Sequence, residues 1–161
     1  MRQERTVRLA QISFGGTSAI VTSIGLIVGF GAAGTPRPTV ITALLIFALA
    51  DNLTDALSIH IYQESERLEE RRAFAATVGN FAARLAICGT FLFLITMLPG
   101  RYAVGASLTW GVLLLTGLTW LVARSRSANA LLEVCKHLAV ALAVIAASHI
   151  IGTAITAFHT G

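Results

Sequence analysis

Five long, mainly apolar stretches constrain the fold of this chain more than any other feature. They cover residues 12–33, 39–62, 81–98, 104–123 and 138–158. A helix of roughly 20 residues crosses the hydrocarbon core of a bilayer, which is about 30 Å thick. We therefore predict an all-α membrane protein with five transmembrane helices, organised as a single integral membrane domain over residues 1–161.

The composition excludes a soluble enzyme and a disordered chain. Hydrophobic residues make up 55% of the sequence and charged residues only 12%, about half the charged share of a soluble domain. The first stretch exceeds the 7–15 apolar residues of a signal peptide, so we expect it to be a retained helix. Proline and glycine mark sharp turns at residues 34–38 and 99–101.

The basic residues predict the orientation. If the N-terminus is cytoplasmic, ten of the twelve lie on the cytoplasmic side, and only Arg37 and Arg101 lie opposite. The positive-inside rule then places the C-terminus outside. Arginine supplies eleven of the twelve, which favours a GC-rich bacterial genome and hence a bacterial inner (plasma) membrane. No basic stripe is interleaved with aromatic residues, so we expect no nucleic-acid partner.

Two acidic residues within the second stretch are the main candidates for a functional site. Asp51 lies near its middle, and Asp55 follows one helical turn later with Ser58 continuing the same face. A carboxylate at that depth is costly and indicates a pathway, a cavity or a partner. Paired oxygens suit a divalent cation such as Mn²⁺ or Fe²⁺, and buried carboxylates also suit a proton relay. The residues themselves favour neither use.

Arg84 offers a purely structural alternative for one of these acids. It lies near the start of the third stretch, at a depth comparable to Asp55, and intramembrane charges commonly pair with each other. An Asp55–Arg84 ion pair would be a packing device. Asp51 lies deeper, with no basic residue expected at its level, so for Asp51 the functional interpretation is preferred.

A short charged segment, residues 63–80, is predicted to link the second and third spans on the cytoplasmic side. Its acidic residues Glu66, Glu69 and Glu70 have helical spacing. Glu–Arg pairs on a solvated extension of the second helix are the favoured interpretation. A cytoplasmic surface that collects metal ions is the alternative.

The first stretch carries small and hydroxyl residues on one face. Gly25 and Gly29 form a GxxxG pattern, which predicts close helix packing. Ser18 and Thr22 either bond to their own backbone or add oxygen ligands to a pathway. No nucleophile–base set, phosphate loop or dinucleotide motif is present, so we expect no enzyme.

Three features resemble the vacuolar iron transporter family. Residues 14–22, Phe-Gly-Gly-Thr-Ser-Ala-Ile-Val-Thr, are similar to the motif of that family's first helix. Residues 55–58, Asp-Ala-Leu-Ser, precede an acidic extension, as in its second helix. The five-span layout, ending in His149-Ile150-Ile151-Gly152, completes the likeness. The resemblance implies a homodimer and Fe²⁺ or Mn²⁺ transport out of the cytosol, coupled to protons, with no permanently bound cofactor.

The sequence also departs from that family. Ser18 stands at the family's first-helix acid, Ile59 at its second-helix methionine, and Tyr62-Gln63-Glu64 at its Gly-Glu-Tyr. The leading hypothesis is a divalent-cation transporter with Asp51, Asp55, Ser58, Glu66, Glu69 and Glu70 as metal ligands. The alternative is a non-transporting membrane scaffold or accessory subunit that keeps the fold.

Overall fold

The computed structural model describes the backbone of residues 2–65 and 70–160, and the side chains in these ranges except residues 2–14, 59, 63–65, 70–73, 75, 76, 159 and 160. The described residues contain five helices and no strand: α1 (Arg2–Ala32), α2 (Arg37–Ser65), α3 (Glu70–Met97), α4 (Gly100–Ser125) and α5 (Ala130–Thr160). Each helix contains a segment long and apolar enough to cross a membrane. The prediction of an all-α chain with five such helices is confirmed.

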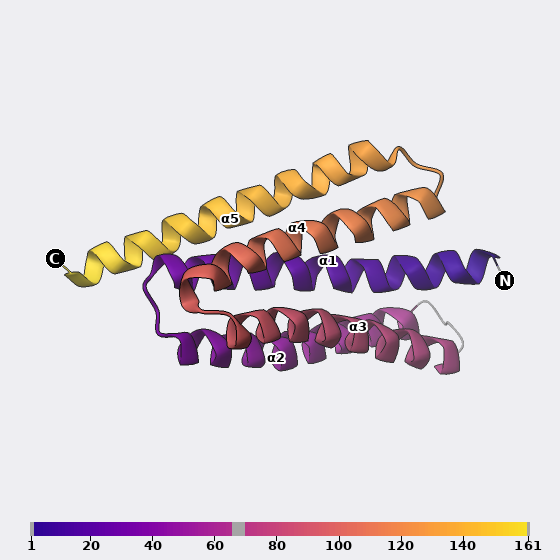
Figure 1. The fold of residues 1–161 in the computed structure, drawn as a ribbon. Coiled ribbons are helices and arrows are strands. Elements are labelled where there is room, and N and C mark those ends of the chain that lie inside the picture. The colour runs from indigo at the N-terminus through magenta and orange to yellow at the C-terminus, as the bar shows by residue number, and fades with distance from the viewer. Residues whose placement is uncertain (1, 66–69, 161) are drawn as a thin grey trace.

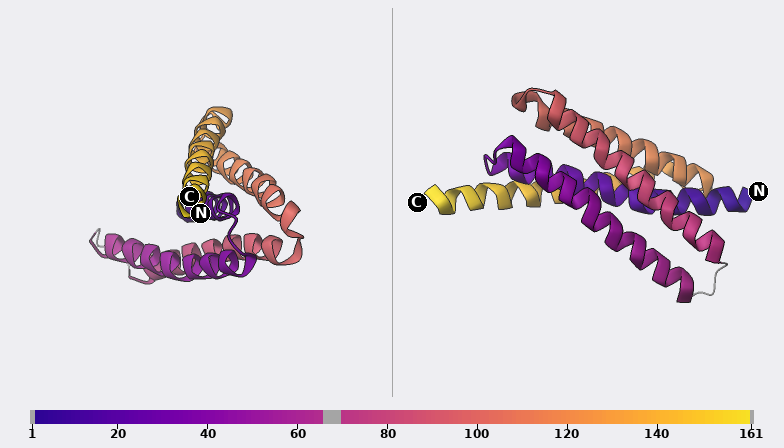
Figure 2. Two further views of the ribbon diagram at one scale, coloured as in Figure 1. Left: turned by 90° about the vertical axis from the view of Figure 1, so that its left-hand side faces the viewer. Right: turned by 90° about the horizontal axis from the view of Figure 1, so that it is seen from below.

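Helix α1 is the central element of the bundle and contacts the other four helices. Helices α2 and α3 lie side by side on one side of α1, whereas α4 and α5 pack on the other side (Figure 2). Successive helices run in opposite directions and their number is odd. The two ends of the chain therefore lie at opposite ends of the bundle (Figure 1).

The core and the outer faces are both apolar. Ile20 and Ile24 of α1 are buried with Phe91 of α3 and Leu115 of α4. Large apolar side chains are also exposed on every helix from α2 to α5, and Phe158 is the most exposed of them. Helices that are apolar on every side are typical of protein cores and of membrane spans.

Two helix ends have the same hydrogen-bond pattern. After α1, Thr35 donates to the carbonyl of Phe30 and Gly34 donates to that of Gly31. This is a Schellman motif, and it requires the left-handed backbone that Gly34 adopts, with φ of 64°. After α4 the equivalent position is Ser127, with φ of 55°. The first of these turns is where the sequence predicted one.

The helices extend beyond the apolar stretches. Helix α5 begins at Ala130, before the predicted start at residue 138, and the Asn129 side chain accepts a hydrogen bond from the Leu132 amide at 3.3 Å. Within the predicted link 63–80, α2 continues to Ser65 and α3 already begins at Glu70. Backbone hydrogen bonding does not depend on side-chain polarity, so hydropathy alone misplaces these helix ends.

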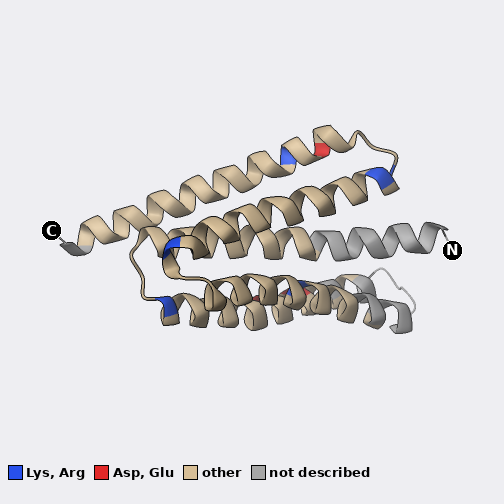
Figure 3. Ribbon diagram, viewed as in Figure 1, with Lys and Arg blue, Asp and Glu red and all other residues tan. Residues whose placement is uncertain are grey.

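The described charges lie at the two ends of the bundle, with one exception (Figure 3). Arg37 and Arg101 lie near one end, where α2 and α4 begin. At the other end are the charges around the α4–α5 turn, which are Arg124, Arg126, Glu133 and Lys136. The exception is a group of three charged residues midway along α2 and α3, described below.

Glycine allows α1 and α5 to approach closely. A Cβ atom on Gly152 would collide with the carbonyl oxygen of Gly29 and would lie 2.9 Å from the Cβ of Ala32. A Cβ on Gly25 would lie 3.0 Å from a methyl group of Val144. The packing role predicted for Gly25 and Gly29 is confirmed, and the partner helix is α5.

We expect Gly152→Ala to destabilise the bundle by about 2 kcal/mol, because the added methyl group meets backbone that has no room to move. Gly117→Ala is the matched control, since a Cβ there meets no atom within 4 Å. It should leave stability unchanged or raise it slightly. Thermal unfolding of the detergent-solubilised variants measures both effects. Equal losses of stability in the two variants would contradict the inference that Gly152 is needed for the close contact of α1 with α5.

Candidate functional site

The exceptional group of charges is centred on Arg84, whose side chain is fully buried between helices. Arg84 lies on the face of α3 that also buries Asn80 and Cys88, one turn on either side of it. Helical spacing brings these three residues into one row. A buried guanidinium is costly unless it is paired and hydrogen-bonded, so the facing helix must supply acceptors.

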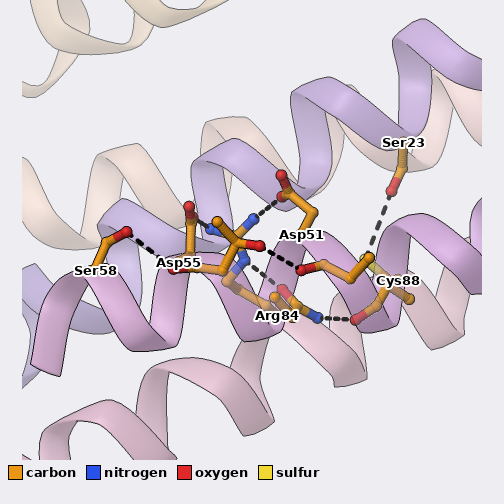
Figure 4. Close-up of polar contacts among 10 residues, drawn as sticks. Ser23, Asp51, Asp55, Ser58, Arg84 and Cys88 are labelled. Carbon is orange, nitrogen blue, oxygen red and sulfur yellow. Dashed lines mark hydrogen bonds and ion pairs between the residues drawn. The ribbon is translucent and has the colours of Figure 1, made fainter.

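Helix α2 supplies three acceptors, and each receives a different nitrogen of Arg84 (Figure 4). Nε donates to Oδ1 of Asn52, Nη1 to Oδ2 of Asp55, and Nη2 to Oδ2 of Asp51. Asn52 is itself held by a 2.5 Å hydrogen bond from Nδ2 to the Ala48 carbonyl. We call Asp51, Asn52, Asp55 and Arg84 the charge cluster.

The charge cluster contains two acids and one base. Two carboxylates and one guanidinium give a formal charge of −1 when both acids are ionised. The guanidinium is completely buried, whereas 42% of the Asp51 side chain and 33% of the Asp55 side chain are exposed. The excess negative charge therefore lies on the accessible side of the cluster.

The structure corrects one prediction and settles one alternative. Asp51 was expected to have no basic residue at its level, and this is wrong, because Arg84 binds it. The long arginine side chain and its forked end span the one-turn separation between the two acids. The Asp55–Arg84 pair, which the sequence left open, is present.

Helix α1 covers the charge cluster through a glycine. A Cβ on Gly15 would collide with the Asn80 amide and would lie 3.0 Å from Cδ of Arg84. Both polar atoms of the Asn80 side chain are buried without a hydrogen-bond partner among the described residues. One turn beyond Arg84, the Cys88 sulfur lies 3.8 Å from the Ser23 hydroxyl of α1. The cluster thus lies within a polar row that joins α1, α2 and α3.

The other predicted ligands are not brought to this cluster by the described contacts. Ser58 is exposed and donates to the Thr54 carbonyl of its own helix at 2.9 Å. Glu66 and Glu69 lie outside the described residues, and Glu70 is described only as the first residue of α3. Within the described part of the chain, no group of three His, Cys, Asp or Glu side chains is close enough to hold a metal ion.

Sequence reasoning missed the roles of Asn52 and Asn80. A signal for Asn80 existed, since it precedes Arg84 by one helical turn and therefore lies on the same face of the helix. Asn52 was noted beside the acids, but the pattern does not show that its amide oxygen completes the shell of Arg84. That contact depends on how α2 and α3 are rotated against each other.

Comparison of the chain with protein-family models, with curated proteins and with solved structures finds no match. The site is therefore interpreted from its own residues.

We expect Arg84→Gln to destabilise the protein by at least about 2 kcal/mol. Removal of one partner from a buried ion pair leaves charges uncompensated, and the partial exposure of the acids reduces the loss. The combined variant Arg84→Gln, Asp51→Asn, Asp55→Asn should recover most of that stability, because no charge is then left behind. Thermal unfolding of the three proteins measures the effect.

Arg101→Gln is the control, because Arg101 is exposed and its guanidinium lies over the Tyr102 ring without an ion-pair partner among the described residues. It should change stability by less than about 0.5 kcal/mol. Failure of the triple variant to recover stability would show that the shape of Arg84, not its charge balance, holds α2 and α3 together.

Proposed function

We propose that the chain is an integral protein of a bacterial inner membrane with five spans, a cytoplasmic N-terminus and an external C-terminus. Five sufficiently long apolar helices and exposed apolar side chains support this location. The distribution of the described charges supports the orientation: Arg37 and Arg101 lie at one end, and Arg124, Arg126 and Lys136 at the other.

The native cysteines provide a test of the proposed orientation. Cys135 is exposed near the start of α5, whereas Cys88 is buried. A membrane-impermeant maleimide should label Cys135 in inside-out vesicles and not in intact cells. Arg101→Cys in a Cys135→Ser background should show the opposite pattern. Labelling of Cys135 from outside the cell would reverse the orientation.

We propose further that the protein transports divalent cations, with Fe²⁺ and Mn²⁺ as the expected cargo and protons as the coupling ion. The observation that carries this proposal is the excess negative charge of the charge cluster. One acid would suffice to neutralise Arg84. The second acid leaves a partly exposed carboxylate halfway along the helices, where a proton or a cation is the natural counter-charge.

The chemistry of the acids supports this choice of cargo. Carboxylate oxygens suit hard and borderline cations such as Mn²⁺ and Fe²⁺. A cation that binds Asp51 and Asp55 together competes with Arg84 for these two carboxylates, so we expect its binding and release to be linked to movement of the guanidinium. A homodimer, as the resemblance to the vacuolar iron transporter family implies, would add ligands from a second copy. Water molecules would complete the coordination of the cation.

A specific observation favours a second candidate function, a non-transporting membrane scaffold or accessory subunit. All three nitrogens of the Arg84 guanidinium are engaged, and the described residues bring no third metal ligand to the acids. In that case the charge cluster only fixes the rotation of α2 against α3. The two candidates differ in whether the excess carboxylate is needed for anything besides folding.

Flux of Mn²⁺ and Fe²⁺ into proteoliposomes, with and without a pH gradient, separates these functions. Asp51→Asn leaves a neutral Asp55–Arg84 pair, so we expect the variant to fold as stably as the natural protein. We expect it to lose at least 90% of the flux, which corresponds to a rise of about 1.4 kcal/mol in the transport barrier. Glu133→Gln removes an acid from another part of the bundle and should retain flux.

The possible results lead to different conclusions. Flux that is lost only in Asp51→Asn supports transport through the charge cluster. Equal flux in Asp51→Asn and the natural protein would retain transport and exclude this site. No flux of either ion through well-folded natural protein would favour the scaffold.

A further inference from the structure

A second polar feature lies on the opposite side of α1 from the charge cluster. Helices α1 and α5 are in contact at Gly29 and Gly152 and diverge towards the other end of the bundle (Figure 1). Between them and α4 is a half-open cavity of about 670 Å³, which we call the wedge cavity. Its polar lining includes Thr17, Ser18, Thr22, Thr119, Arg126, Glu133 and His137.

Counted together with a smaller hollow that adjoins it, the wedge cavity has a formal charge of +1 on its described lining residues, from Arg126 and Lys136 against Glu133. Glu133 is paired with Lys136 at 2.9 Å, so these two residues balance each other. Lys136 lines the smaller hollow. Arg126, at the end of α4, is exposed and has no ion-pair partner among the described residues. An anion is therefore attracted to this cavity, and a metal cation is repelled.

The lining also contains a buried hydroxyl group and a histidine ring. Thr119 is buried, with a relative exposure of 5%. Its hydroxyl group has no hydrogen-bond partner among the described residues. A buried hydroxyl without a partner is costly. The Nδ1 atom of His137 lies 2.8 Å from the Glu133 carbonyl. Because a carbonyl only accepts, Nδ1 carries the hydrogen, and Nε2 of the neutral ring can only accept a hydrogen bond.

The rest of the lining is apolar. Val21, Val122 and Val140 come from α1, α4 and α5, and Ala123 lies beside them. The volume falls within the range of small-molecule sites, about 300–1,000 Å³. A site lined by one arginine without an ion-pair partner, by hydroxyl groups and by valine side chains suits an amphiphilic ligand. Such a ligand has an anionic group with oxygen atoms attached to an apolar part. Arginine is well suited to phosphate oxygens in particular.

We propose that the wedge cavity binds a phosphate group, and that its source is the headgroup of an anionic phospholipid. The cavity lies at the end of the bundle with Arg124, Arg126 and Lys136, which is the cytoplasmic end in the proposed orientation. Anionic lipids attract basic side chains at that surface. The valines then contact the first part of the acyl chains. This inference rests on the proposed membrane location and does not depend on cation transport.

Native mass spectrometry of the detergent-solubilised full chain tests the proposal. Phosphatidylglycerol and phosphatidylcholine are added as competing probes, and inorganic phosphate is added in a separate series. We expect preferred binding of phosphatidylglycerol, a roughly tenfold weaker preference in Arg126→Gln, and partial recovery in Arg126→Lys. An arginine–phosphate contact of ordinary strength accounts for a change of that size.

Arg124→Gln is the matched control, because Arg124 lies two residues away on the same helix end and does not line the wedge cavity. It should keep the preference within about twofold, since a single exposed charge contributes little. Thr119→Val adds a second readout. It should weaken phosphatidylglycerol binding without lowering the unfolding temperature of the lipid-free protein, because the hydroxyl it removes has no protein partner.

Each remaining outcome overturns part or all of the proposal. Equal losses in Arg124→Gln and Arg126→Gln would show attraction to surface charge without a site. Equal binding of both lipids would exclude headgroup recognition. Displacement of phosphatidylglycerol by millimolar phosphate would assign the cavity to a free phosphate and exclude the lipid source. These results are independent of ion flux, so failure here leaves the transport proposal standing, and the reverse also holds.

Discussion

The forked hydrogen bonding of Arg84 is the interaction on which the arrangement of this bundle depends. Apolar helices pack against each other with little preference for rotation, because one aliphatic face resembles the next. A buried guanidinium removes that freedom, since its nitrogens must meet acceptors in fixed directions. Asp51, Asn52 and Asp55 provide them at helical spacing. The rotation of α2 against α3 is set by this contact.

The same requirement explains the small residues around the charge cluster. Arg84 and Asn80 need space on the side of α1, and Gly15 provides it. On the far side of α1, Gly25 and Gly29 allow α5 to approach closely. A third close contact, Gly111 against Ile24, fixes α4. Helix α1 therefore presents glycines to α3, α4 and α5 and receives one glycine each from α4 and α5, which lets it pack closely against these three helices.

The sequence predicted the number and type of the helices because a run of apolar residues between turns is visible in one dimension. It could not predict the ion pair between Asp51 and Arg84. The two residues were judged to lie at different depths in the membrane, and the length of the arginine side chain, which spans that difference, was not taken into account. It also placed the start of α5 eight residues late, by the difference between residues 138 and 130, since polar residues such as Glu133 and Lys136 are as helical as their apolar neighbours. Ser18 and Thr22 were expected either to bond to their own backbone or to add oxygen ligands to a pathway, and both line the wedge cavity beside α4 and α5.

Helix α1 separates the charge cluster from the wedge cavity, and this arrangement limits how either can change. Gly15 and Ser23 contact the polar row of α3. The cavity is lined by Thr17, Ser18 and Thr22, which lie between Gly15 and Ser23 in the sequence. A hydrogen-bonded helix moves as a rigid element over so short a length, so a displacement of α1 that widens the cavity must press Gly15 towards Asn80 and Arg84. There is no room there even for a Cβ atom on Gly15. The polar row of α3 therefore limits how far α1 can move to widen the cavity, and the packing around Arg84 limits the size of the molecule that the cavity admits.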